Sequence, residues 1–395
     1  MNFKRWGFTP FLIIILSFFV VLTWYNYRFK PLNQVETEKG ATANDLAVSG
    51  QSADSVSSKT ASDLAFESLS TKQKVGLTLA FPLLINDNWS ASASADIQPG
   101  FITIFGSDID QAKMEEVNRQ LNQVFANQPW RPVLAVDHEG GQVQRLSGNG
   151  FTQLESWLNV CSLPQEDRLQ ISSESASELA SSGIGVVFGP VVDLYNSGSS
   201  IGSRSCSADP QEVIDRSLEL MKAYAQQGIL PVIKHYPGIG QSRSDLHQAF
   251  EEIDVSEADL QPFLSILNQQ PLSGVMVSHV GISDLYSTPC SLTKYCVEAL
   301  LKGFPKTLVF SDALDMKAVY SSSDLEIESG DLLTPARLAL EAGVDVLVFG
   351  QGVRPEQLEI LSDQLVELSE QEPSFKALID ARARKIWDYR QVYWN

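Results

Sequence analysis

A segment of fourteen residues holds the side chains best suited to proton transfer. It reads KHYPGIGQSRSDLH from position 234 to 247 and contains two of the four histidines of the chain. Its proline and glycines predict a loop that follows the buried apolar run 229–233. Asp245 and His247 lie two residues apart on this loop, so the carboxylate could orient the imidazole and favour its charged form. Such a pair is typical of a mobile general acid/base, and an ordinary surface Asp–His pair is the alternative interpretation.

Other polar side chains stand at the points where further apolar runs end. They are Asp137, His138, Glu139 and Arg145, then Asp193 and Arg204, then Lys234 and His235, then Ser278 and His279, and finally Ser311 and Asp312. With His247, this set includes every histidine of the chain. In a barrel of parallel strands the carboxyl ends of the strands form one face, where active sites lie. We therefore predict an active site on that face.

Some of these residues have a second interpretation. Asp193 and Asp312 could cap the helices that follow them, and for Asp193 this interpretation is as good as a role in a site. Asp312 follows a buried run and is expected at the same face as the four histidines, which favours a functional role. Arg145 and Arg204 could be solvated surface charges, although both lie in loops that contain glycine.

The elements that must position these side chains alternate along the chain. Eight apolar runs predict strands at 77–81, 101–105, 133–136, 185–192, 230–233, 274–277, 307–310 and 344–349. Helical patterns lie between several of them, at 111–127, 210–227 and 334–342. Alternating β and α units predict an α/β fold with a closed (β/α)8 barrel of the TIM type, which an amphipathic helix at 375–390 would complete. Seven or nine strands would fit the pattern almost as well.

Composition and charge narrow the class of protein. The 395 residues carry a net charge of −19 and are 44% hydrophobic, which indicates a folded acidic protein. The acidic net charge argues against a nucleic-acid partner, because phosphate binding requires basic patches. Residues 1–30, in contrast, contain four basic residues and no acidic one.

The N-terminal region predicts attachment to a membrane. Residues 6–25 are uncharged and almost continuously apolar, which is long enough to cross a bilayer as a helix. Aromatic residues follow this run instead of a small-residue cleavage site, so we expect an uncleaved anchor. Lys4 and Arg5 on the short N-terminal tail favour an orientation with the folded part on the extracytoplasmic side. Residues 31–66 are rich in Ser, Ala and Thr and predict a flexible linker. The predicted domains are therefore an anchor (1–30), a linker (31–66) and a barrel (67–395), which begins near a capping box formed by Ser70 and Gln73.

The four cysteines leave two interpretations open. Cys161, Cys206, Cys290 and Cys296 make an even count in a domain that is expected outside the cytoplasm, which allows one or two disulfides. Cys290 and Cys296 are close enough in sequence to close a small loop, and half-buried free thiols are an equally good interpretation. No C-x-x-C pattern occurs, which argues against a zinc or redox site, and we expect no metal and no cofactor.

The motifs at the predicted strand ends resemble those of the bacterial β-N-acetylhexosaminidases of glycoside hydrolase family 3. Five segments carry the resemblance, in the order of the family: DHEGGQVQRL (137–146), IGSRS (201–205), KHYPGIGQSRSDLH (234–247), MVSHV (276–280) and VFSDALDMKAV (309–319). The KHYPGxG…DxH element is similar to that of the single-domain subgroup, in which an Asp–His dyad replaces a glutamate acid/base from another domain. Gln142, Ile239 and Ala313 depart from the pattern, because Arg, His and Asp are common there.

The resemblance implies a retaining exo-β-N-acetylglucosaminidase (β-N-acetylhexosaminidase) that removes terminal N-acetylglucosamine from peptidoglycan fragments or related glycans. In this reading Asp312 is the nucleophile, His247 the general acid/base and Asp245 its orienting partner. The residues that would bind the sugar in the −1 pocket are Asp137, Arg145, Arg204, Lys234 and His235. We expect a monomer.

Three other functions fit parts of the same pattern. A neutral histidine repels anions less than a carboxylate does. Phosphate could therefore replace water as the acceptor of the sugar, which would make the protein an N-acetylglucosamine phosphorylase. A catalytically inactive, membrane-tethered glycan-binding protein on a decayed barrel is disfavoured because Asp312 and the Asp245–His247 pair are both retained. A metal-dependent amidohydrolase would need an early H-x-H pair, which the chain lacks.

Overall fold

The computed structural model describes residues 59–86, 90–322 and 324–394. The predicted membrane anchor and most of the predicted linker lie outside these residues. Among the helices that are described, none combines the length and the hydropathy needed to span a bilayer.

Within the described residues, the main sheet consists of eight parallel strands whose order follows the chain. They are β1 (Leu79–Leu84), β2 (Phe101–Phe105), β3 (Val133–Val136), β6 (Ile184–Val191), β7 (Leu230–Tyr236), β9 (Gly274–Val277), β11 (Leu308–Ser311) and β12 (Leu347–Val348). β12 pairs with β1, and a parallel bridge between Phe310 and Val346 links the two ends of the sheet. The sheet is thus a nearly closed barrel, as the alternation of apolar runs and helices predicts.

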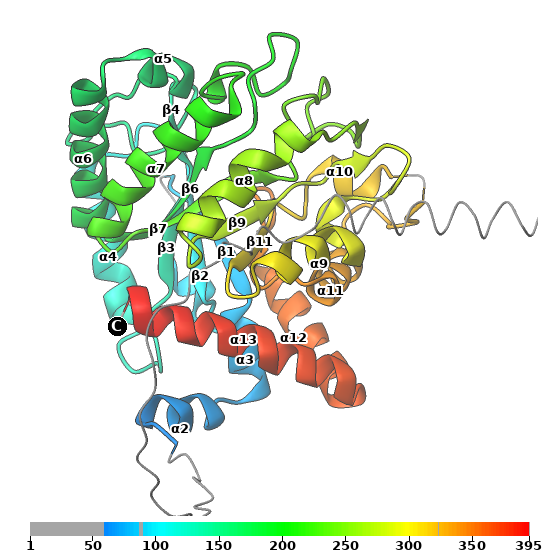
Figure 1. Ribbon diagram of the computed structural model, residues 1–395. Helices are drawn as coiled ribbons and strands as arrows, with labels where there is room; N and C mark the ends of the chain where they lie inside the picture. Colours follow the sequence, from blue (N-terminus) through cyan, green and yellow to red (C-terminus); the bar gives the residue numbers. More distant parts are fainter. Residues whose placement is uncertain (1–58, 87–89, 323, 395) are drawn as a thin grey trace, which may run out of the picture. The chain divides into compact units, whose positions relative to one another are not determined.

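Helices surround this sheet. They are α2 (Ala61–Glu67), α3 (Thr71–Leu77), α4 (Gln111–Val124), α5 (Trp157–Ser162), α6 (Gln165–Ser181), α7 (Pro210–Gln226), α8 (Glu257–Gln269), α9 (Lys294–Gly303), α10 (Lys317–Tyr320), α11 (Leu333–Ala342), α12 (Pro355–Gln371) and α13 (Pro373–Tyr393). Figure 1 shows α13 and α3 side by side at one end of the strands, while α5 and α10 lie toward the other end. The short pieces are β4 (His138–Gly140), β5 (Val143–Gln144), β8 (Glu252–Ile253), β10 (Gly281–Ile282), η1 (Ala91–Ser94), η2 (Gly202–Arg204) and η3 (Cys290–Leu292).

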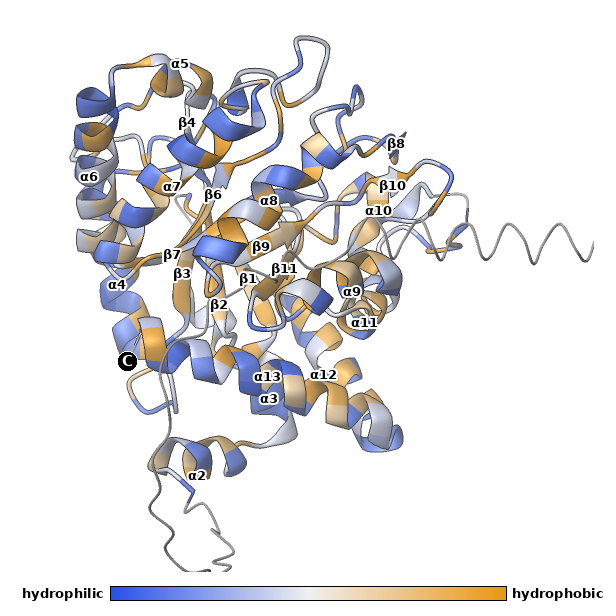
Figure 2. Cartoon of the chain, in the orientation of Figure 1, coloured by the Kyte–Doolittle hydropathy of each residue, from blue (hydrophilic) through white to orange (hydrophobic). Residues whose placement is uncertain are grey.

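Two layers of apolar side chains hold the barrel together. Successive side chains of a strand point to opposite faces, so every strand contributes both to the barrel interior and to the layer beneath the helices. The interior is filled by aromatic rings: Phe310 packs edge-on against Phe101 at 5.5 Å and Phe188 at 5.8 Å between ring centroids. Figure 2 shows the strands mostly in hydrophobic colours and the helices with hydrophilic stretches between the apolar ones.

The C-terminal helix closes the end of the barrel opposite the candidate site. Trp394, just past α13, packs edge-on against Phe101 at 5.7 Å and donates a hydrogen bond from Nε1 to the Gly185 carbonyl oxygen at 3.0 Å. A helix close to the predicted 375–390 is present, but it lies across the amino ends of the strands and does not complete the ring of helices, which corrects that part of the prediction. Trp394 thus covers the barrel interior at this end, while the cavity described below opens at the carboxyl ends of the strands.

The boundaries of some elements differ from those predicted. Leu77 ends a helix instead of beginning a strand, because the capping box of Ser70 and Gln73 starts α3 and β1 begins only at Leu79. The last part of the predicted linker also folds: α2 begins with its own capping box at Thr60 and Asp63. Phe66 of α2 is buried against Trp387 of α13, with ring centroids 6.2 Å apart, and this contact gives the short helix its tertiary support.

Candidate active site

A cavity of about 730 Å³ opens at the carboxyl ends of the barrel strands. All eight predicted site residues line it: Asp137, Arg145, Arg204, Lys234, His235, Asp245, His247 and Asp312. They come from the loops after β3 and β6, from β7 and its following loop, and from the residue directly after β11. The structure therefore brings together residues up to 175 positions apart, from Asp137 to Asp312.

The floor of the cavity is a network of opposite charges. Lys234 Nζ lies 2.8 Å from Asp137 Oδ1 and 2.6 Å from Glu139 Oε1. The Arg204 guanidinium donates to both oxygens of Glu139, at 2.7 and 2.9 Å. Arg145 Nη2 lies farther out, 3.7 Å from Asp137 Oδ2. Since Lys234 and Glu139 are almost fully buried, each charge depends on its partners.

The pKa values follow from this pairing. Burial opposes the ionised form of Glu139, but Lys234 and Arg204 outweigh it and hold the pKa of Glu139 well below its ordinary value. Burial also opposes the charged form of Lys234, whereas Asp137 and Glu139 raise its pKa above the usual range. Glu139 and Lys234 are therefore both charged at neutral pH, and the cavity floor presents fixed donors and acceptors suited to sugar hydroxyls.

A short hairpin places Glu139 in this network. β4 and β5 pair antiparallel around Gly140 and Gly141, which have φ values of 87° and 57°. A Cβ atom on Gly140 would lie 2.3 Å from the Glu155 carbonyl oxygen, so only glycine fits this turn. The glycines that follow the acidic residues in the sequence are thus part of the site's construction.

Asp193 fixes the orientation of His235. The carboxylate of Asp193 is fully buried and accepts hydrogen bonds from His235 Nδ1 at 2.7 Å and from the Ile239 backbone N–H at 2.8 Å. This bond places the proton on Nδ1 and leaves Nε2 of His235 as an acceptor toward Arg204 Nη2, at 3.5 Å. The helix-cap interpretation of Asp193 is wrong, because Asp209 caps the helix that follows.

Asp312 directly follows β11 and is partly exposed to the cavity. Its Oδ1 accepts a hydrogen bond from the Ala313 backbone N–H at 2.8 Å. Burial opposes ionisation of Asp312, but His279, His235 and the Ala313 N–H outweigh it and keep the pKa below its ordinary value. Asp312 does not cap a helix, since α10 begins only at Lys317 after Met316. It is available as a carboxylate.

Asp245 and His247 form the predicted pair on the loop after β7. His247 Nδ1 lies 2.8 Å from Asp245 Oδ1, and the His247 backbone N–H donates to the same oxygen at 2.9 Å. Burial opposes the ionised form of Asp245, but these bonds from His247 lower its pKa. The side chains of His247 and Asp245 are 69% and 58% exposed, in contrast to the buried floor. The pair therefore stands at the open rim of the cavity.

Two of the four histidines do not face the cavity, which corrects the expectation that all four would. His138 lies between Asp137 and Glu139 on an extended segment, so strand alternation points it away from the side that these two carboxylates share. His279 is buried below the site, where Nε2 donates to the Ala313 carbonyl oxygen at 3.0 Å and Nδ1 lies 2.7 Å from Ser291 Oγ. His279 thus supports the segment that carries Asp312.

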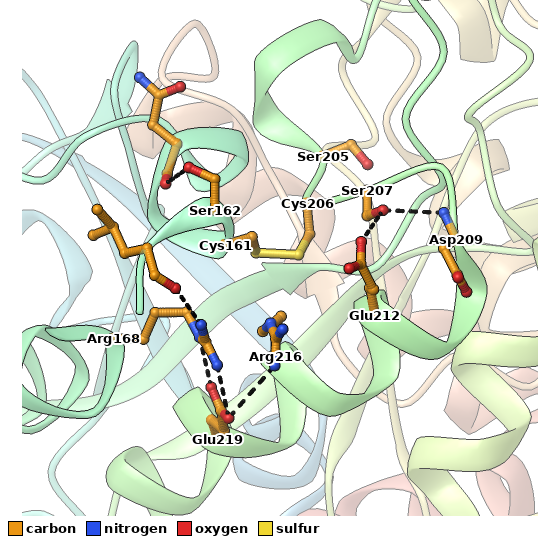
Figure 3. Close-up of a disulfide and its surroundings, with 12 residues drawn as sticks. Cys161, Ser162, Arg168, Ser205, Cys206, Ser207, Asp209, Glu212, Arg216 and Glu219 are labelled. Carbon is orange, nitrogen blue, oxygen red and sulfur yellow. Dashed lines mark hydrogen bonds and ion pairs between the residues drawn. A yellow bond between two sulfur atoms is a disulfide. The ribbon is translucent and has the colours of Figure 1, made fainter. Parts of the chain in front are cut away.

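Both cysteine pairs form disulfides, Cys161–Cys206 and Cys290–Cys296, so the free-thiol interpretation is wrong. Figure 3 shows Cys161 at the end of α5 bonded to Cys206 on the loop before α7. The Arg168–Glu219 ion pair, at 2.9 Å, joins α6 to α7 in the same region. Since Cys206 is two residues after Arg204, the disulfide ties the loop that carries this arginine to a helix.

Three further side chains build the site. The sequence placed Glu139 and Asp193 at predicted strand ends without assigning them a definite role, and it did not single out Asp315; Glu139 and Asp315 line the cavity. For Glu139 a signal existed, because it is two residues after Asp137 and an extended segment places such residues on the same side. For Asp315, whose Oδ1 accepts a hydrogen bond from the Gly350 N–H at 2.5 Å, the partner is distant in sequence and no local signal exists.

Comparison with known proteins identifies the family of the chain. The family model described as "Glycosyl hydrolase family 3 N terminal domain" matches residues 85–388. A β-hexosaminidase of Tolumonas auensis is 30% identical over 263 residues, which cover 63% of this chain and 75% of the relative. A β-hexosaminidase of Actinobacillus succinogenes is 31% identical over 277 residues, or 67% of this chain and 76% of the relative.

Solved structures share the fold. The β-N-acetylhexosaminidase of Beutenbergia cavernae superposes with a TM-score of 0.70 at 23% identity, over 82% of this chain and 99% of that one. A family 3 β-N-acetylglucosaminidase of a Paenibacillus species gives 0.69 at 24% identity, over 82% of this chain and 63% of that one. The chain belongs to glycoside hydrolase family 3, and it is a glycosidase.

Proposed function

We propose that the protein is a retaining exo-β-N-acetylglucosaminidase, with Asp312 as nucleophile and His247 as general acid/base. One observation carries the proposal: an ionised carboxylate at the end of a strand and a loop-borne Asp–His pair line the same cavity. Retaining hydrolysis needs these two functions, one to trap the oxocarbenium-like centre and one to protonate the leaving oxygen.

The reaction would proceed in two steps. His247 donates a proton to the glycosidic oxygen while Asp312 attacks the anomeric carbon, which releases the alcohol and leaves a glycosyl ester on Asp312. His247, now neutral, removes a proton from water, and the resulting attack on the anomeric carbon frees the sugar and restores Asp312. Asp245 holds the imidazole through its Nδ1 in both steps, so that Nε2 exchanges the proton.

The charged floor would hold the sugar. Lys234, Arg204 and Asp137 present donors and acceptors toward the cavity, and His235 is fixed in one tautomer by Asp193. Because these side chains already hydrogen-bond to one another, they need little reorganisation when the hydroxyls of a bound sugar replace water. Arg145 at the outer edge completes the set of predicted sugar ligands.

Several relatives support N-acetylglucosamine as the sugar. The similar curated proteins are called β-hexosaminidases, and a solved relative is called a β-N-acetylglucosaminidase. The apolar segment 6–25 further suggests attachment to a membrane with the barrel on its extracytoplasmic side. Peptidoglycan fragments or related β-linked glycans close to the membrane are therefore the substrates we propose.

Incubation with 4-nitrophenyl N-acetyl-β-glucosaminide tests the activity. We expect release of nitrophenol by the wild-type protein and no turnover by Asp312→Ala. Near-normal turnover by that variant would refute the assigned nucleophile. The same assay with added inorganic phosphate shows whether water or phosphate accepts the sugar. Hydrolysis gives free N-acetylglucosamine, whereas a phosphorylase would give the sugar 1-phosphate.

A further inference from the structure

The two side chains of the acid/base pair have few contacts of their own with the barrel. His247 and Asp245 are mostly exposed, and the hydrogen bonds described for their side chains are those between the two residues. The position of the imidazole over the cavity therefore depends on the backbone of the acid/base loop, which we define as residues 237–251.

Glu251, at the end of the acid/base loop, binds the residues that lead into the pair. Its carboxylate accepts hydrogen bonds from Ser242 Oγ at 2.8 Å, from the Ser244 N–H at 2.8 Å and from the Arg243 N–H at 3.1 and 3.2 Å. These donors belong to the three consecutive residues that precede Asp245. One carboxylate thus joins the outgoing arm of the loop to its returning arm.

Glu251 is itself anchored to the barrel side of the molecule. Its carbonyl oxygen accepts a hydrogen bond from the Gly281 N–H at 2.9 Å, and the next two residues form β8, which pairs with β10. The opposite side of the loop rests on the segment after Asp312, where the Ala318 N–H donates to the Leu246 carbonyl oxygen at 3.2 Å. The loop is therefore held by Glu251, which joins its two arms, and by Leu246, which lies between Asp245 and His247.

The ionisation of Glu251 strengthens this contact. Burial opposes its charged form, but the hydrogen bonds from Ser244, Ser242 and Arg243 outweigh burial and lower its pKa. Hydrogen bonds to a carboxylate are shorter and stronger than those between neutral groups. The loop thus relies on a charged group that lines neither the sugar pocket nor its rim.

We propose that Glu251 is a positioning residue for the acid/base pair, which fixes the acid/base loop so that His247 reaches the glycosidic oxygen. The proposal rests on the proposed function, since it requires His247 to act as the acid. Without the Glu251 carboxylate the N–H groups of residues 243 and 244 turn to water, and the loop occupies more conformations. The imidazole then spends less time at the leaving group, while the sugar floor and Asp312 are unchanged.

The test compares leaving groups. Protonation by His247 matters for phenyl N-acetyl-β-glucosaminide, whose phenol leaves poorly, and hardly at all for the 2,4-dinitrophenyl glycoside, whose phenol leaves without a proton. For Glu251→Gln we expect kcat/KM on the phenyl glycoside to fall by about tenfold or more and on the dinitrophenyl glycoside by less than about twofold. Since kcat/KM reports the step that releases the phenol, later hydrolysis of the glycosyl-enzyme does not interfere.

Two variants calibrate the result. Glu252→Gln changes the adjacent, exposed carboxylate and should leave both substrates unaffected. Ser242→Ala removes one of the donors to Glu251 and should give a smaller loss with the same preference for the dinitrophenyl glycoside. Ser242→Ala also keeps the proposal testable if Glu251→Gln does not fold.

Equal losses on both glycosides, or no loss on either, would overturn the positioning role of Glu251. A wild-type protein that cleaves neither glycoside would instead contradict the proposed function, so the two failures are distinguishable.

Discussion

Glu139 is the carboxylate on which two cations of the candidate site depend. It lies within 2.6 to 2.9 Å of Lys234 and Arg204 and is almost fully buried. Removing one member of a buried charge cluster leaves its partners without compensation, which costs more than the pair contributes in net stability. The effect of Glu139 should therefore be seen in stability as well as in substrate binding.

For Glu139→Gln we expect the free energy of unfolding at pH 7 to fall by about 3 kcal/mol. Denaturant unfolding measures this change. The exposed Glu328→Gln serves as the control, for which we expect a change below about 0.5 kcal/mol. A Glu139→Gln protein as stable as the control would contradict the charge network.

His138 gives the protein a predictable sensitivity to acid. Both of its ring nitrogens are buried and lack a hydrogen-bond partner among the described residues, and burial lowers its pKa from 6.5 to about 4. The unfolded chain binds a proton below about pH 6.5 and the folded protein only near pH 4, so stability is lost as the pH falls between these values. The full shift of the His138 pKa corresponds to about 3 kcal/mol in the free energy of unfolding.

The measurement is thermal or denaturant unfolding as a function of pH. We expect the His138→Gln protein to lose less stability than wild type between pH 7 and pH 4.5, whatever its stability at pH 7. Parallel curves for the two proteins would show that His138 does not carry this dependence.

At the scale of single residues, the sequence predicted which residue types form the cavity better than it predicted which way neighbouring side chains point. The polar residues after apolar runs identified all eight side chains predicted for the cavity, because parallel strands end at one face. Which neighbour points inward was harder to predict: Glu139 lines the cavity and His138 does not. That difference depends on backbone alternation through a short hairpin, which residue types alone do not reveal.

At the scale of elements, loops held by covalent and tertiary contacts position the chemistry. The eight predicted strands are all present, yet β1 starts later than predicted because the α3 capping box extends the preceding helix. The central residues of a strand can be predicted from the local apolar pattern. The ends of a strand are harder to predict, because helix caps and neighbouring elements decide where it begins and ends. Disulfide pairing depends on which loops meet in space, which the sequence left open.

The two disulfides should differ in their contribution to stability. Cys161–Cys206 spans 45 residues and Cys290–Cys296 spans 6, so the chain-entropy model gives about 4 and about 2 kcal/mol. We expect the double variant Cys161→Ala/Cys206→Ala to unfold at a lower temperature than Cys290→Ala/Cys296→Ala. The reverse order, measured by calorimetry, would show that local packing outweighs loop closure.

At the scale of the whole molecule, the barrel could be predicted because its alternation of strand and helix extends over the chain. The sequence did not predict that Trp394 would cover the amino end of the barrel or that α2 would pack against α13. Both features depend on contacts between residues that are distant in sequence. The N-terminal segment remains a prediction from its composition.

That segment predicts where the protein is found in the cell. We expect the full-length chain to be recovered with membranes and to resist extraction by high salt, because a span of twenty apolar residues inserts into the bilayer. A protein that begins at Lys59 should be recovered in the soluble fraction with unchanged activity. Full-length protein in the soluble fraction would contradict the anchor.

The central claim is that Asp312 forms a covalent bond to the sugar. A 5-fluoro derivative of N-acetylglucosaminyl fluoride slows both steps while its good leaving group keeps the first one accessible, so the glycosyl-enzyme accumulates. Mass spectrometry of the proteolysed protein should then find one added sugar on the peptide that contains Asp312, and none in Asp312→Ala. A label on another residue, or an unlabelled protein that still cleaves the substrate, would contradict the account.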